Sequence, residues 1–498
     1  MAKKIMIQGT MSGVGKSLLT AGLCRVLRQD GFRVAPFKSQ NMSLNSYITD
    51  EGLEMGRAQV VQAEACGIAP SVYMNPILLK PVTNMGSQVI VNGEVRGNMQ
   101  AADYFKYKKA LIPDIIHAFD ELSSRYDVIV IEGAGSPAEI NLKKDDIVNM
   151  GLAKMLRSPV LLAGDIDRGG VFAQLIGTLM LLEEDERELV KATIVNKFRG
   201  DLEILRPGIS MLEERSGKPV AGVLPYLQVD IEEEDSLTDR FSSQKRDAAL
   251  DIVVIRLPKI SNFTDFMAME ATEGVGLRYV EKSRDLGRPD MVILPGTKNT
   301  IADLIWLRSS GLEASIKRLA GEGVPVFGIC GGYQILGDMI RDPENTEGGG
   351  EVAGMGLLPI KTEFHPEKNR LRCSGYVEAE GDVFASLHGV RVEGYEIHMG
   401  ISRLKDGGVP LVIFSDGRKD GCIAGNIAGT YLHGFFDESC CRNAIFSALC
   451  ERKGIPPLEE NAFDLSKYKN EQFDLLAEAV RENLDMPFIY QLINESEG

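Results

Sequence analysis

The chain has 498 residues, of which 44% are hydrophobic and 25% charged, a composition typical of a globular protein with two or three domains. Its formal net charge of −16 argues against nucleic acid or an anionic membrane surface as the main partner. The N-terminus leaves no room for a signal peptide, and no apolar run approaches the roughly 20 residues of a membrane helix. The cysteines show no Cys-x-x-Cys spacing. We therefore predict a cytoplasmic protein with reduced thiols.

A glycine-rich loop follows the first predicted strand, at 5–8, and precedes a predicted helix from about residue 18 to 29. Such a loop presents backbone N–H groups to phosphate oxygens, with a lysine as charge partner and a hydroxyl as Mg²⁺ ligand. It is one residue longer than the standard Gly-x-x-x-x-Gly-Lys-Ser form, and in this it resembles dethiobiotin synthetase-like ligases. We therefore predict an ATP site formed by Gly9, Thr10, Gly13, Gly15, Lys16 and Ser17, with Ser17 as a Mg²⁺ ligand.

Two polar segments follow, each with a lysine at the end of an apolar run. The first, residues 36–46, is dense in amides and hydroxyls and contains Lys38. The second, residues 74–82, contains Lys80 and resembles the lysine-bearing loop of a site that handles anions. A generic loop explains polar composition but not the placement of the two lysines. We expect Lys38 to contact phosphates or an activated acyl phosphate.

Three further apolar runs of the first half read as buried strands that end in polar residues: 126–131, 159–164 and 191–195. Strands that alternate with helices predict a doubly wound, mostly parallel α/β sheet. Glu132, at the carboxyl end of a strand beside the nucleotide, is expected to be the second Mg²⁺ ligand. Asn196 matches the position that contacts the adenine base in the dethiobiotin synthetase-like group. For Asp165, Asp167 and Arg168, a role at the metal or acceptor and a solvated loop both remain open.

The clearest compositional break is the charged segment 231–246, after which a new apolar strand begins at Leu250. We place the boundary there. This gives a P-loop synthetase domain at 1–230 and an α/β domain at 251–441. The pattern after 441 is helical, and its apolar spacing indicates packing against the body, so 442–498 is predicted to be a short helical C-terminal extension.

The most informative stretch of the second domain surrounds Cys330. A predicted strand at 324–329 runs into Cys330, two glycines follow, and a helix is expected from about Tyr333. Glycines permit the sharp strand-to-helix turn that lifts a nucleophile clear of a sheet, and a helix N-terminus favours a thiolate. A buried structural cysteine would not need these glycines. We therefore predict that Cys330 is a nucleophile.

A thiol nucleophile needs a base, and the chain has five histidines. His433 ends the segment Gly-Thr-Tyr-Leu-His, which resembles the Gly-Thr-x-x-His segment of class I glutamine amidotransferases. In that family, a Cys–His pair attacks the glutamine amide and forms a glutamyl thioester. A further element, Leu-Pro-Gly-Thr-Lys-Asn at 294–299, also resembles the family. It implies an oxyanion site made by Gly296 or Thr297 together with Gly331.

One feature departs from that family's pattern. Many class I members carry His-Pro-Glu, in which the glutamate orients the histidine, whereas Gly434 and Phe435 follow His433 here. Either another group orients His433, or the pair works without a third member. For His398, in a second polar cluster at 394–400, we expect a structural hydrogen bond, with contact to glutamine or to the acceptor as the alternative.

The two halves considered jointly resemble the cobyric acid synthase family over nearly the whole chain. The segments that carry this resemblance are 8–17, 38–45, 56–59, 74–81, 132–141, 164–174 and 196–201. It implies amidation of the b, d, e and g side-chain carboxylates of adenosylcobyrinic acid a,c-diamide, which gives adenosylcobyric acid in cobalamin biosynthesis. It also implies that the chain uses ATP and Mg²⁺ as cofactors, holds no tightly bound prosthetic group, and takes glutamine and a corrinoid as substrates. A homo-oligomeric state remains possible.

Two alternative functions remain open, one enzymatic and one non-catalytic. One is another ATP-dependent amidoligase of the same architecture, such as cobyrinic acid a,c-diamide synthase or, more distantly, cytidine triphosphate synthase; the segments 38–45 and 164–170 favour the first assignment. The other is a non-catalytic P-loop switch with a vestigial glutaminase fold. One chain retains Lys16, Ser17, Cys330 and His433 together, which speaks against it.

Overall fold

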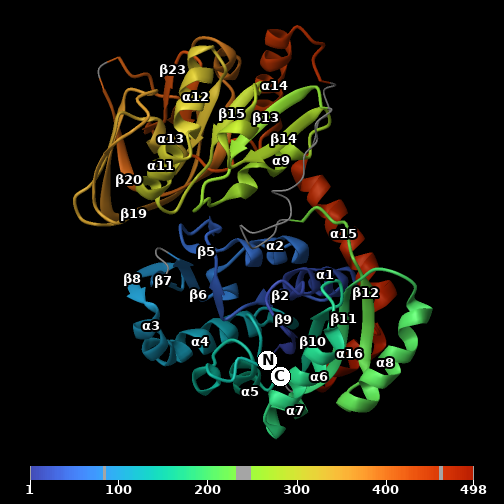
Figure 1. Ribbon diagram of the computed structural model, residues 1–498. Helices are drawn as coiled ribbons and strands as arrows, with labels where there is room; N and C mark the ends of the chain where they lie inside the picture. The colour runs from blue at the N-terminus through green and yellow to red at the C-terminus, as the bar shows by residue number, and fades with distance from the viewer. Residues whose placement is uncertain (1, 82–85, 232–247, 406, 459–463, 497–498) are drawn as a thin grey trace. The chain divides into compact units, whose positions relative to one another are not determined.

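The structure is a computed structural model that describes residues 2–81, 86–231, 248–405, 407–458 and 464–496 (Figure 1). Its contacts divide the chain into two compact units. Unit 1 consists of Met1–Ser43, Leu53–Glu234 and Ser466–Gly498, and unit 2 consists of Leu44–Gly52 and Asp235–Leu465.

This division differs from the sequence-based one at two places. The segment Leu44–Gly52 is counted with unit 2, although it lies within the predicted synthetase domain. The C-terminal extension is shared between the units because α14 (Ser439–Lys453) belongs to unit 2 and α16 (Met486–Glu495) to unit 1. Beyond its first residue, the segment 231–246, where we placed the boundary, lies outside the described residues.

Unit 1 is built on a parallel sheet with the strand order β12-β11-β10-β1-β9-β2. The strands are β1 (Lys3–Gly9), β2 (Val34–Phe37), β9 (Val128–Glu132), β10 (Val160–Asp165), β11 (Val190–Phe198) and β12 (Val220–Pro225). Apart from Lys3, every residue of β1, β2, β9 and β10 is buried, as expected for parallel strands that are covered on both faces. The predicted doubly wound P-loop fold is confirmed.

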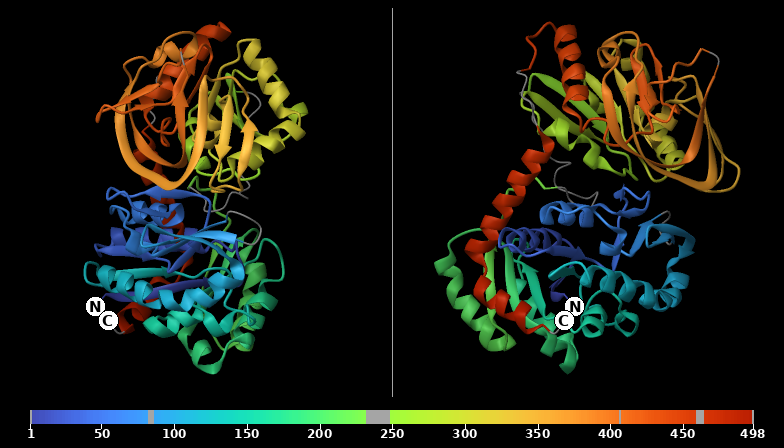
Figure 2. Two further views of the ribbon diagram at one scale, coloured as in Figure 1. Left: turned by 90° about the vertical axis from the view of Figure 1, so that its left-hand side faces the viewer. Right: turned by 180° about the vertical axis from the view of Figure 1, so that it is seen from behind.

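The helices of unit 1 are α1 (Lys16–Gln29), α2 (Arg57–Cys66), α3 (Ala101–Tyr107), α4 (Ile112–Ser123), α5 (Met150–Leu156), α6 (Val171–Leu181), α7 (Glu184–Leu189), α8 (Leu202–Ser216), α15 (Leu465–Asn483) and α16, and several of them cover this sheet. Leu23 and Leu27, one turn apart on α1, share a core with Ile5 and Ile7 of β1. The C-terminal helices, red in Figures 1 and 2, complete this core with residues that include Val480.

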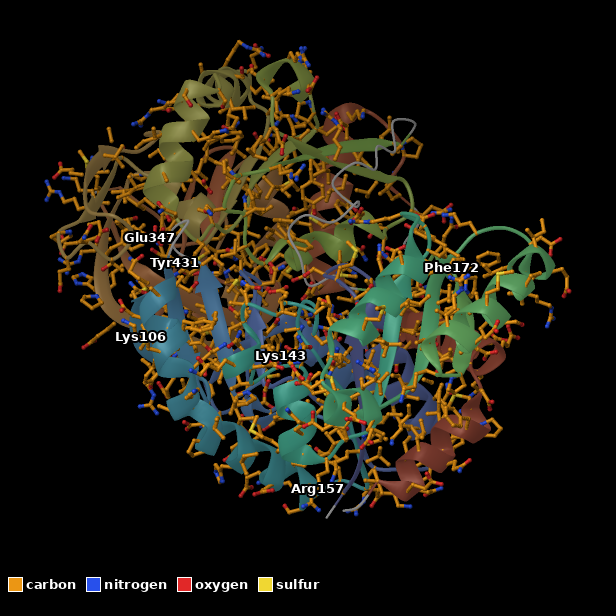
Figure 3. All side chains as sticks on the ribbon, turned by 60° about the horizontal axis from the view of Figure 1, so that its bottom comes forward. Lys106, Lys143, Arg157, Phe172, Glu347 and Tyr431 are labelled. Atoms are coloured by element: carbon orange, nitrogen blue, oxygen red, sulfur yellow. The ribbon has the colours of Figure 1, made fainter. Side chains whose placement is uncertain are left out.

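Other helices pack against the remaining strands and against each other. Phe119 of α4 meets Phe37 of β2 edge to face, with ring centroids 5.4 Å apart. Phe172 of α6, labelled in Figure 3, lies against Gly208 of α8, where an added Cβ would come within 2.8 Å of its ring. A glycine inside α8 therefore permits the two helices to approach closely.

A second, mixed sheet of unit 1 has the strand order β3-β6-β7-β8. Its strands are β3 (Gln40–Met42), β6 (Ile77–Pro81), β7 (Gly86–Val91) and β8 (Glu94–Gln100), and β5 (Glu54–Gly56) lies between β3 and β6 in sequence. Short 3-10 helices in this unit are η1 (Val72–Met74), η2 (Lys108–Leu111) and η3 (Lys143–Asp145).

Unit 2 contains a sheet with the strand order β14-β13-β15-β16-β24-β23, in which β23 is antiparallel and the other pairs are parallel. Its strands are β13 (Leu250–Ile255), β14 (Val275–Val280), β15 (Met291–Leu294), β16 (Val326–Ile329), β23 (Cys422–Ala424) and β24 (Ile427–Thr430). The helices of this unit are α9 (Met267–Glu270), α10 (Ser283–Leu286), α11 (Thr300–Ser309), α12 (Leu312–Gly321), α13 (Gly331–Leu336) and α14, with the 3-10 helices η5 (Phe263–Phe266) and η6 (Val383–Leu387).

A second sheet of unit 2 has the order β18-β17-β19-β21-β22, with β20 also paired to β19. The strands are β17 (Met339–Asp342), β18 (Gly350–Ala353), β19 (Ile360–Val377), β20 (Arg391–Leu404), β21 (Val412–Phe414) and β22 (Lys419–Asp420), and the short strand β4 (Ser46–Ile48) also belongs to this unit. In Figure 2, β19 and β20 are the long orange strands that run antiparallel beside each other.

None of the helices in the described ranges combines the length and apolar character needed to cross a membrane.

Candidate active site

Three adjacent parallel strands of unit 2 end beside one another and carry the predicted glutaminase elements. β15 leads into Gly296 and Thr297, β16 leads into Cys330, and β24 leads into His433. Because β16 lies between β15 and β24, the thiol emerges between the two other elements. The carboxyl ends of parallel strands are where α/β proteins bind ligands.

Cys330 occupies a strained turn. Its φ of 51° and ψ of −108° lie in a region that residues with a side chain rarely adopt. This turn lets α13 begin directly at Gly331, two residues before the predicted start at Tyr333. A Cβ added to Gly331 would lie 3.0 Å from the backbone nitrogen of Thr297, so the two predicted oxyanion residues are neighbours.

His433 is held by a carboxylate that the sequence analysis missed. Its Nδ1 lies 2.7 Å from Oδ2 of Asp265, and the backbone N–H of Gly434 donates to Oδ1 of the same side chain at 3.2 Å. Both side chains are buried. Asp265 is therefore the other group that orients His433, since the glutamate of a His-Pro-Glu segment is missing here.

The charge of Asp265 determines the protonation of His433. Burial by itself would lower the pKa of this imidazole, but the charge and hydrogen bond of Asp265, followed by those of Cys330, raise the pKa of His433 to about 10. Cys330 is thus one of the groups near His433 that favour its protonated form. A protonated histidine beside a thiol stabilises the thiolate form.

Neighbouring residues hold the His433 ring in place. The ring of Tyr395 stacks on it with centroids 5.3 Å apart and an interplanar angle of 18°. The two residues also exchange backbone hydrogen bonds, at 3.1 and 2.9 Å. On another side, a Cβ at Gly296 would lie 3.2 Å from Cε1 of His433. A larger residue at 296 would therefore crowd the imidazole.

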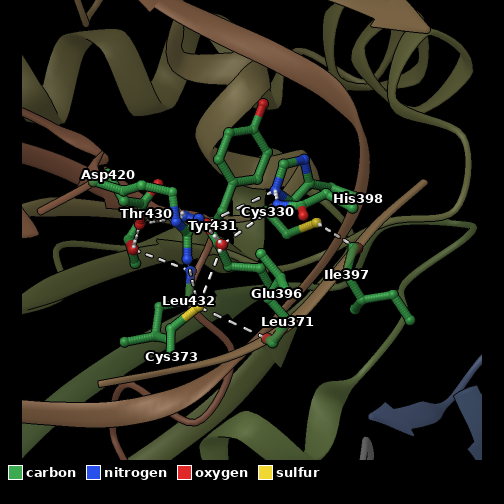
Figure 4. A network of polar contacts seen from close by, with 12 residues as sticks. Cys330, Leu371, Cys373, Glu396, Ile397, His398, Asp420, Thr430, Tyr431 and Leu432 are labelled. Carbon is green, nitrogen blue, oxygen red and sulfur yellow. Dashed lines mark hydrogen bonds and ion pairs between the residues drawn. The ribbon is translucent and has the colours of Figure 1, made fainter. Parts of the chain in front are cut away.

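Figure 4 shows the polar network beside Cys330. The thiol donates to the backbone carbonyl of Ile397 at 3.7 Å. Next in the chain, His398 stacks on Tyr431 with ring centroids 3.7 Å apart, and its Nδ1 lies 2.7 Å from the carbonyl of Gly400. The Tyr431 hydroxyl accepts from Gln334 Nε2 at 3.1 Å. His398 thus makes the structural hydrogen bond that we expected of it.

The phosphate-type loop of unit 1 has the expected strand–loop–helix context. Gly13 and Gly15 adopt φ values of 75° and 94°, which favour glycine. The Lys16 ammonium donates to the carbonyls of Met11 at 3.0 Å and Gly135 at 3.1 Å. It therefore spans the loop, close to where phosphates bind in such loops.

Glu132 is the centre of a buried polar cluster at the end of β9. Its Oε1 accepts from Ser17 Oγ at 2.9 Å and from Lys38 Nζ at 2.8 Å, and its Oε2 accepts from Gln62 at 2.6 Å. Burial would raise the pKa of Glu132, but Lys38 outweighs it and the pKa is lowered, so the carboxylate is ionised. The structure thus brings together three residues that were predicted to handle ATP and Mg²⁺.

Hydroxyl and carboxylate oxygens suit Mg²⁺, which commonly takes one or two protein ligands and completes its shell with phosphates and water. Ser17 and Glu132 fit that donor set. Within the described residues, no cluster of three or more His, Cys, Asp or Glu side chains could hold a metal by itself. A metal at this site would therefore depend on the oxygens of the nucleotide.

The remaining predicted residues lie around the same loop. Asn196 donates through Nδ2 to the carbonyl of Val14 at 2.7 Å, and Thr10 Oγ1 donates to Gln174 at 3.1 Å. Asp165 is buried and forms an ion pair with Lys197 at 3.1 Å. In these contacts Asn196 supports the backbone of the loop; its contact with adenine stays a prediction.

Lys80 is placed differently from our expectation of an anion-handling loop. It lies within β6, and its ammonium is 3.0 Å from the carboxylate of Glu54. Both side chains are buried. A buried ion pair satisfies the lysine within the fold, so the position of Lys80 at the end of an apolar run does not by itself indicate a ligand site.

Comparisons with known proteins identify the family of both domains. Residues 251–440 match the family model of the CobB/CobQ-like glutamine amidotransferase domain, and residues 5–237 match that of the CobQ/CobB/MinD/ParA nucleotide binding domain. A cobyric acid synthase of Lachnoclostridium phytofermentans is 56% identical over 519 residues, which cover 99% of this chain and 100% of the relative. The chain belongs to the cobyric acid synthase family.

Other members of the family match equally fully. The relative from Ruminiclostridium cellulolyticum is 56% identical over 99% of this chain and 98% of its own length, and that from Alkaliphilus metalliredigens is 50% identical over 98% and 99%. The predicted family, fold class and enzyme class are confirmed: the chain is a ligase of the glutamine-hydrolysing type, with a nucleotide-binding domain and a glutamine amidotransferase domain.

Proposed function

We propose that this chain converts adenosylcobyrinic acid a,c-diamide into adenosylcobyric acid by amidating the b, d, e and g carboxylates, with glutamine as the nitrogen donor and ATP as the activating substrate. Full-length relatives named cobyric acid synthase support the choice of reaction. The observation that carries the chemistry is the 2.7 Å contact of His433 with Asp265, at the end of the strand that pairs with the strand leading into the strained turn at Cys330.

The glutaminase reaction begins when the Cys330 thiolate attacks the side-chain carbonyl of glutamine and an S–C bond forms. The oxyanion receives N–H groups from Gly331 and from the turn at Gly296 or Thr297. His433 then gives its proton to the departing nitrogen, which leaves as ammonia. Water hydrolyses the remaining glutamyl thioester and releases glutamate.

The synthetase reaction activates a carboxylate, which is a poor acyl donor. A carboxylate oxygen of the corrinoid attacks the γ-phosphorus of ATP, and ADP leaves, which gives an acyl phosphate. Ammonia attacks the acyl carbon, and phosphate leaves with the former carboxylate oxygen. Positioning and charge stabilisation carry most of such phosphoryl transfer, and we assign these tasks to the phosphate loop with Lys16 and to Lys38.

In this proposal, Ser17 and Glu132 would hold Mg²⁺, which would supply positive charge to offset the charge that develops on the phosphate oxygens. The ion pair between Glu132 and Lys38 keeps the carboxylate ionised, as metal binding requires. We assign Asn196 to the adenine-facing side of the site.

Mass spectrometry of the product tests this proposal against the amidoligase alternative. The purified protein is incubated with MgATP, glutamine and adenosylcobyrinic acid a,c-diamide, and each amidation replaces one hydroxyl by an amino group. We expect a product with four added amides. Amidation of cobyrinic acid itself at the a and c positions, with no reaction of the diamide, would instead identify a cobyrinic acid a,c-diamide synthase.

A further inference from the structure

The segment Leu44–Gly52 belongs to unit 2, although the residues on either side of it in the sequence belong to unit 1. It is not a surface loop: the side chains of Asn45 and Ser46 are each only 1% exposed, and Ile48 is fully buried. Buried amides and hydroxyls need hydrogen-bond partners. The partners of this segment lie next to the catalytic histidine.

Two hydrogen bonds join Asn262 to Asn45 and Ser46. The backbone N–H of Asn262 donates to Oδ1 of Asn45 at 2.8 Å, and the backbone N–H of Ser46 donates to Oδ1 of Asn262 at 3.2 Å. Asn262 has a φ of 52°, a left-handed conformation that asparagine tolerates better than most residues with a side chain. Asn45 thus fixes the residue that begins η5.

Helix η5 carries the carboxylate that orients His433. The backbone N–H of Asp265 donates to the carbonyl of Asn262 at 3.1 Å. Only two residues lie between them, so a shift or rotation of Asn262 displaces the Asp265 side chain. A carboxylate at 2.7 Å from an imidazole nitrogen has little room for such a shift before the hydrogen bond weakens.

The same segment also contacts the aromatic support of His433. The Tyr395 hydroxyl donates to the carbonyl of Ser46 at 3.3 Å and accepts from Asn262 Nδ2 at 3.3 Å. Tyr47 meets the Tyr395 ring edge to face, with centroids 5.4 Å apart. Both groups that hold the imidazole, Asp265 and Tyr395, are therefore tied to residues 45–47.

We propose that Asn45 is a positioning residue of the glutaminase reaction. It touches no reacting atom in the proposed mechanism and acts through Asn262 and Asp265 on His433. This inference depends on the proposed role of Cys330 and His433. It divides the polar segment 36–46, in which we expected Lys38 to contact phosphates, into a part that serves ATP, around Lys38, and a part that serves glutamine hydrolysis.

Steady-state glutamine hydrolysis by the full chain tests this inference in the variants Asn45→Ala, Asp265→Asn and the double variant. Loss of one hydrogen bond in the support predicts a kcat about five- to tenfold lower in Asn45→Ala, with little change in KM. In the Asp265→Asn background, Asn45→Ala should lower kcat by less than about twofold, because the group it positions is already gone. The same factor in both backgrounds, or a change in KM alone, would overturn the inference.

A second variant keeps the test decisive if Asn45→Ala folds poorly. Tyr395→Phe removes the hydroxyl that bonds Asn262 and Ser46 but keeps the ring on His433, and we expect the same dependence on Asp265. Asp50→Asn is the matched control, since Asp50 is exposed and lies 3.4 Å from Arg372 at the far end of the segment. If the wild type and this control release no glutamate, the proposed function is wrong. If the wild type is active and Asn45→Ala is equally active, only the positioning role of Asn45 is wrong.

Discussion

Replacing Asp265 by asparagine keeps the shape of the His433 support and removes its charge. The side chains of His433 and Asp265 are 1% and 4% exposed, so little water can substitute for the lost carboxylate. Burial, which opposes the proton, would then dominate, and the pKa of His433 would fall from about 10. The imidazole would become neutral at the pH where the wild type keeps it protonated.

The size of the effect follows from the burial of the pair. Removing one partner of a buried charge pair costs about 3–5 kcal/mol. If this cost falls on the transition state, glutamine hydrolysis slows roughly 10²- to 10⁴-fold. We expect most of the loss in kcat because Asp265 contacts His433 and not the glutamine substrate of the proposed mechanism.

Two assays of Asp265→Asn check this reasoning. Glutamate release should fall by that factor, while amidation with added ammonium should continue, because the synthetase residues belong to unit 1. In the wild type, kcat/KM for glutamine should decline near pH 10 as His433, with its pKa of about 10, loses its proton, and in the variant the decline should begin at lower pH. Asp382→Asn, at a partly exposed ion pair with Arg452, is the matched control. Unchanged glutamate release, or an unchanged pH profile, would refute the role of Asp265.

Three further predictions concern the synthetase half and the pH dependence of stability. Lys16→Ala should lower the rate of amidation at least about 10²-fold with glutamine and with ammonium, since it removes a charge from the phosphate loop. Lys154→Ala, at an exposed ion pair, is the control. Amidation with ammonium at the wild-type rate in Lys16→Ala would contradict the assignment. Glu132→Gln removes the carboxylate that pairs with buried Lys38, so we expect the free energy of unfolding to drop by about 3–5 kcal/mol. We also expect a raised KM for MgATP. An unchanged denaturation midpoint would count against this prediction. Burial raises the pKa of Glu347 to about 7 from 4.5. Between these pH values the folded chain therefore binds a proton that the unfolded chain has lost, and the free energy of unfolding falls as pH rises. Glu347→Gln should flatten this pH dependence in thermal denaturation, and an equally steep dependence in the variant would contradict the reasoning.

Local patterns allowed much of the catalytic framework to be predicted. The run into Cys330 reads as strand, turn and helix because its apolar residues and glycines are contiguous. The same holds for the phosphate loop and for the strand that ends at Glu132. In each case the structure needs only neighbouring residues to specify the element.

Partners that lie far apart in sequence could not be predicted in this way. Asp265 is 168 residues from His433 and lies in a 3-10 turn, which has no extended periodicity. A carboxylate between two phenylalanines at 263–266 was the available signal, since an acid in an apolar run implies a buried partner. Asn45 and Asn262 are separated by 217 residues, and nothing in the amide-rich stretch distinguishes a phosphate contact from a structural one.

Charged residues at the ends of apolar runs were equally ambiguous. Lys38 and Lys80 have the same local pattern, yet the first pairs with Glu132 beside the phosphate loop and the second with Glu54 in another part of unit 1. Which acid a lysine meets depends on how strands are ordered in the sheets, and strand order is a property of the whole fold.

Isotopic labelling tests the central claim, that Cys330 liberates the nitrogen that the ATP-dependent half installs. The wild type and Cys330→Ala are each given MgATP, the corrinoid, glutamine labelled at its amide nitrogen, and unlabelled ammonium, and the product is analysed by mass spectrometry. The account predicts labelled amides from the wild type and amides derived from ammonium alone from Cys330→Ala. Label in the product of Cys330→Ala would contradict it.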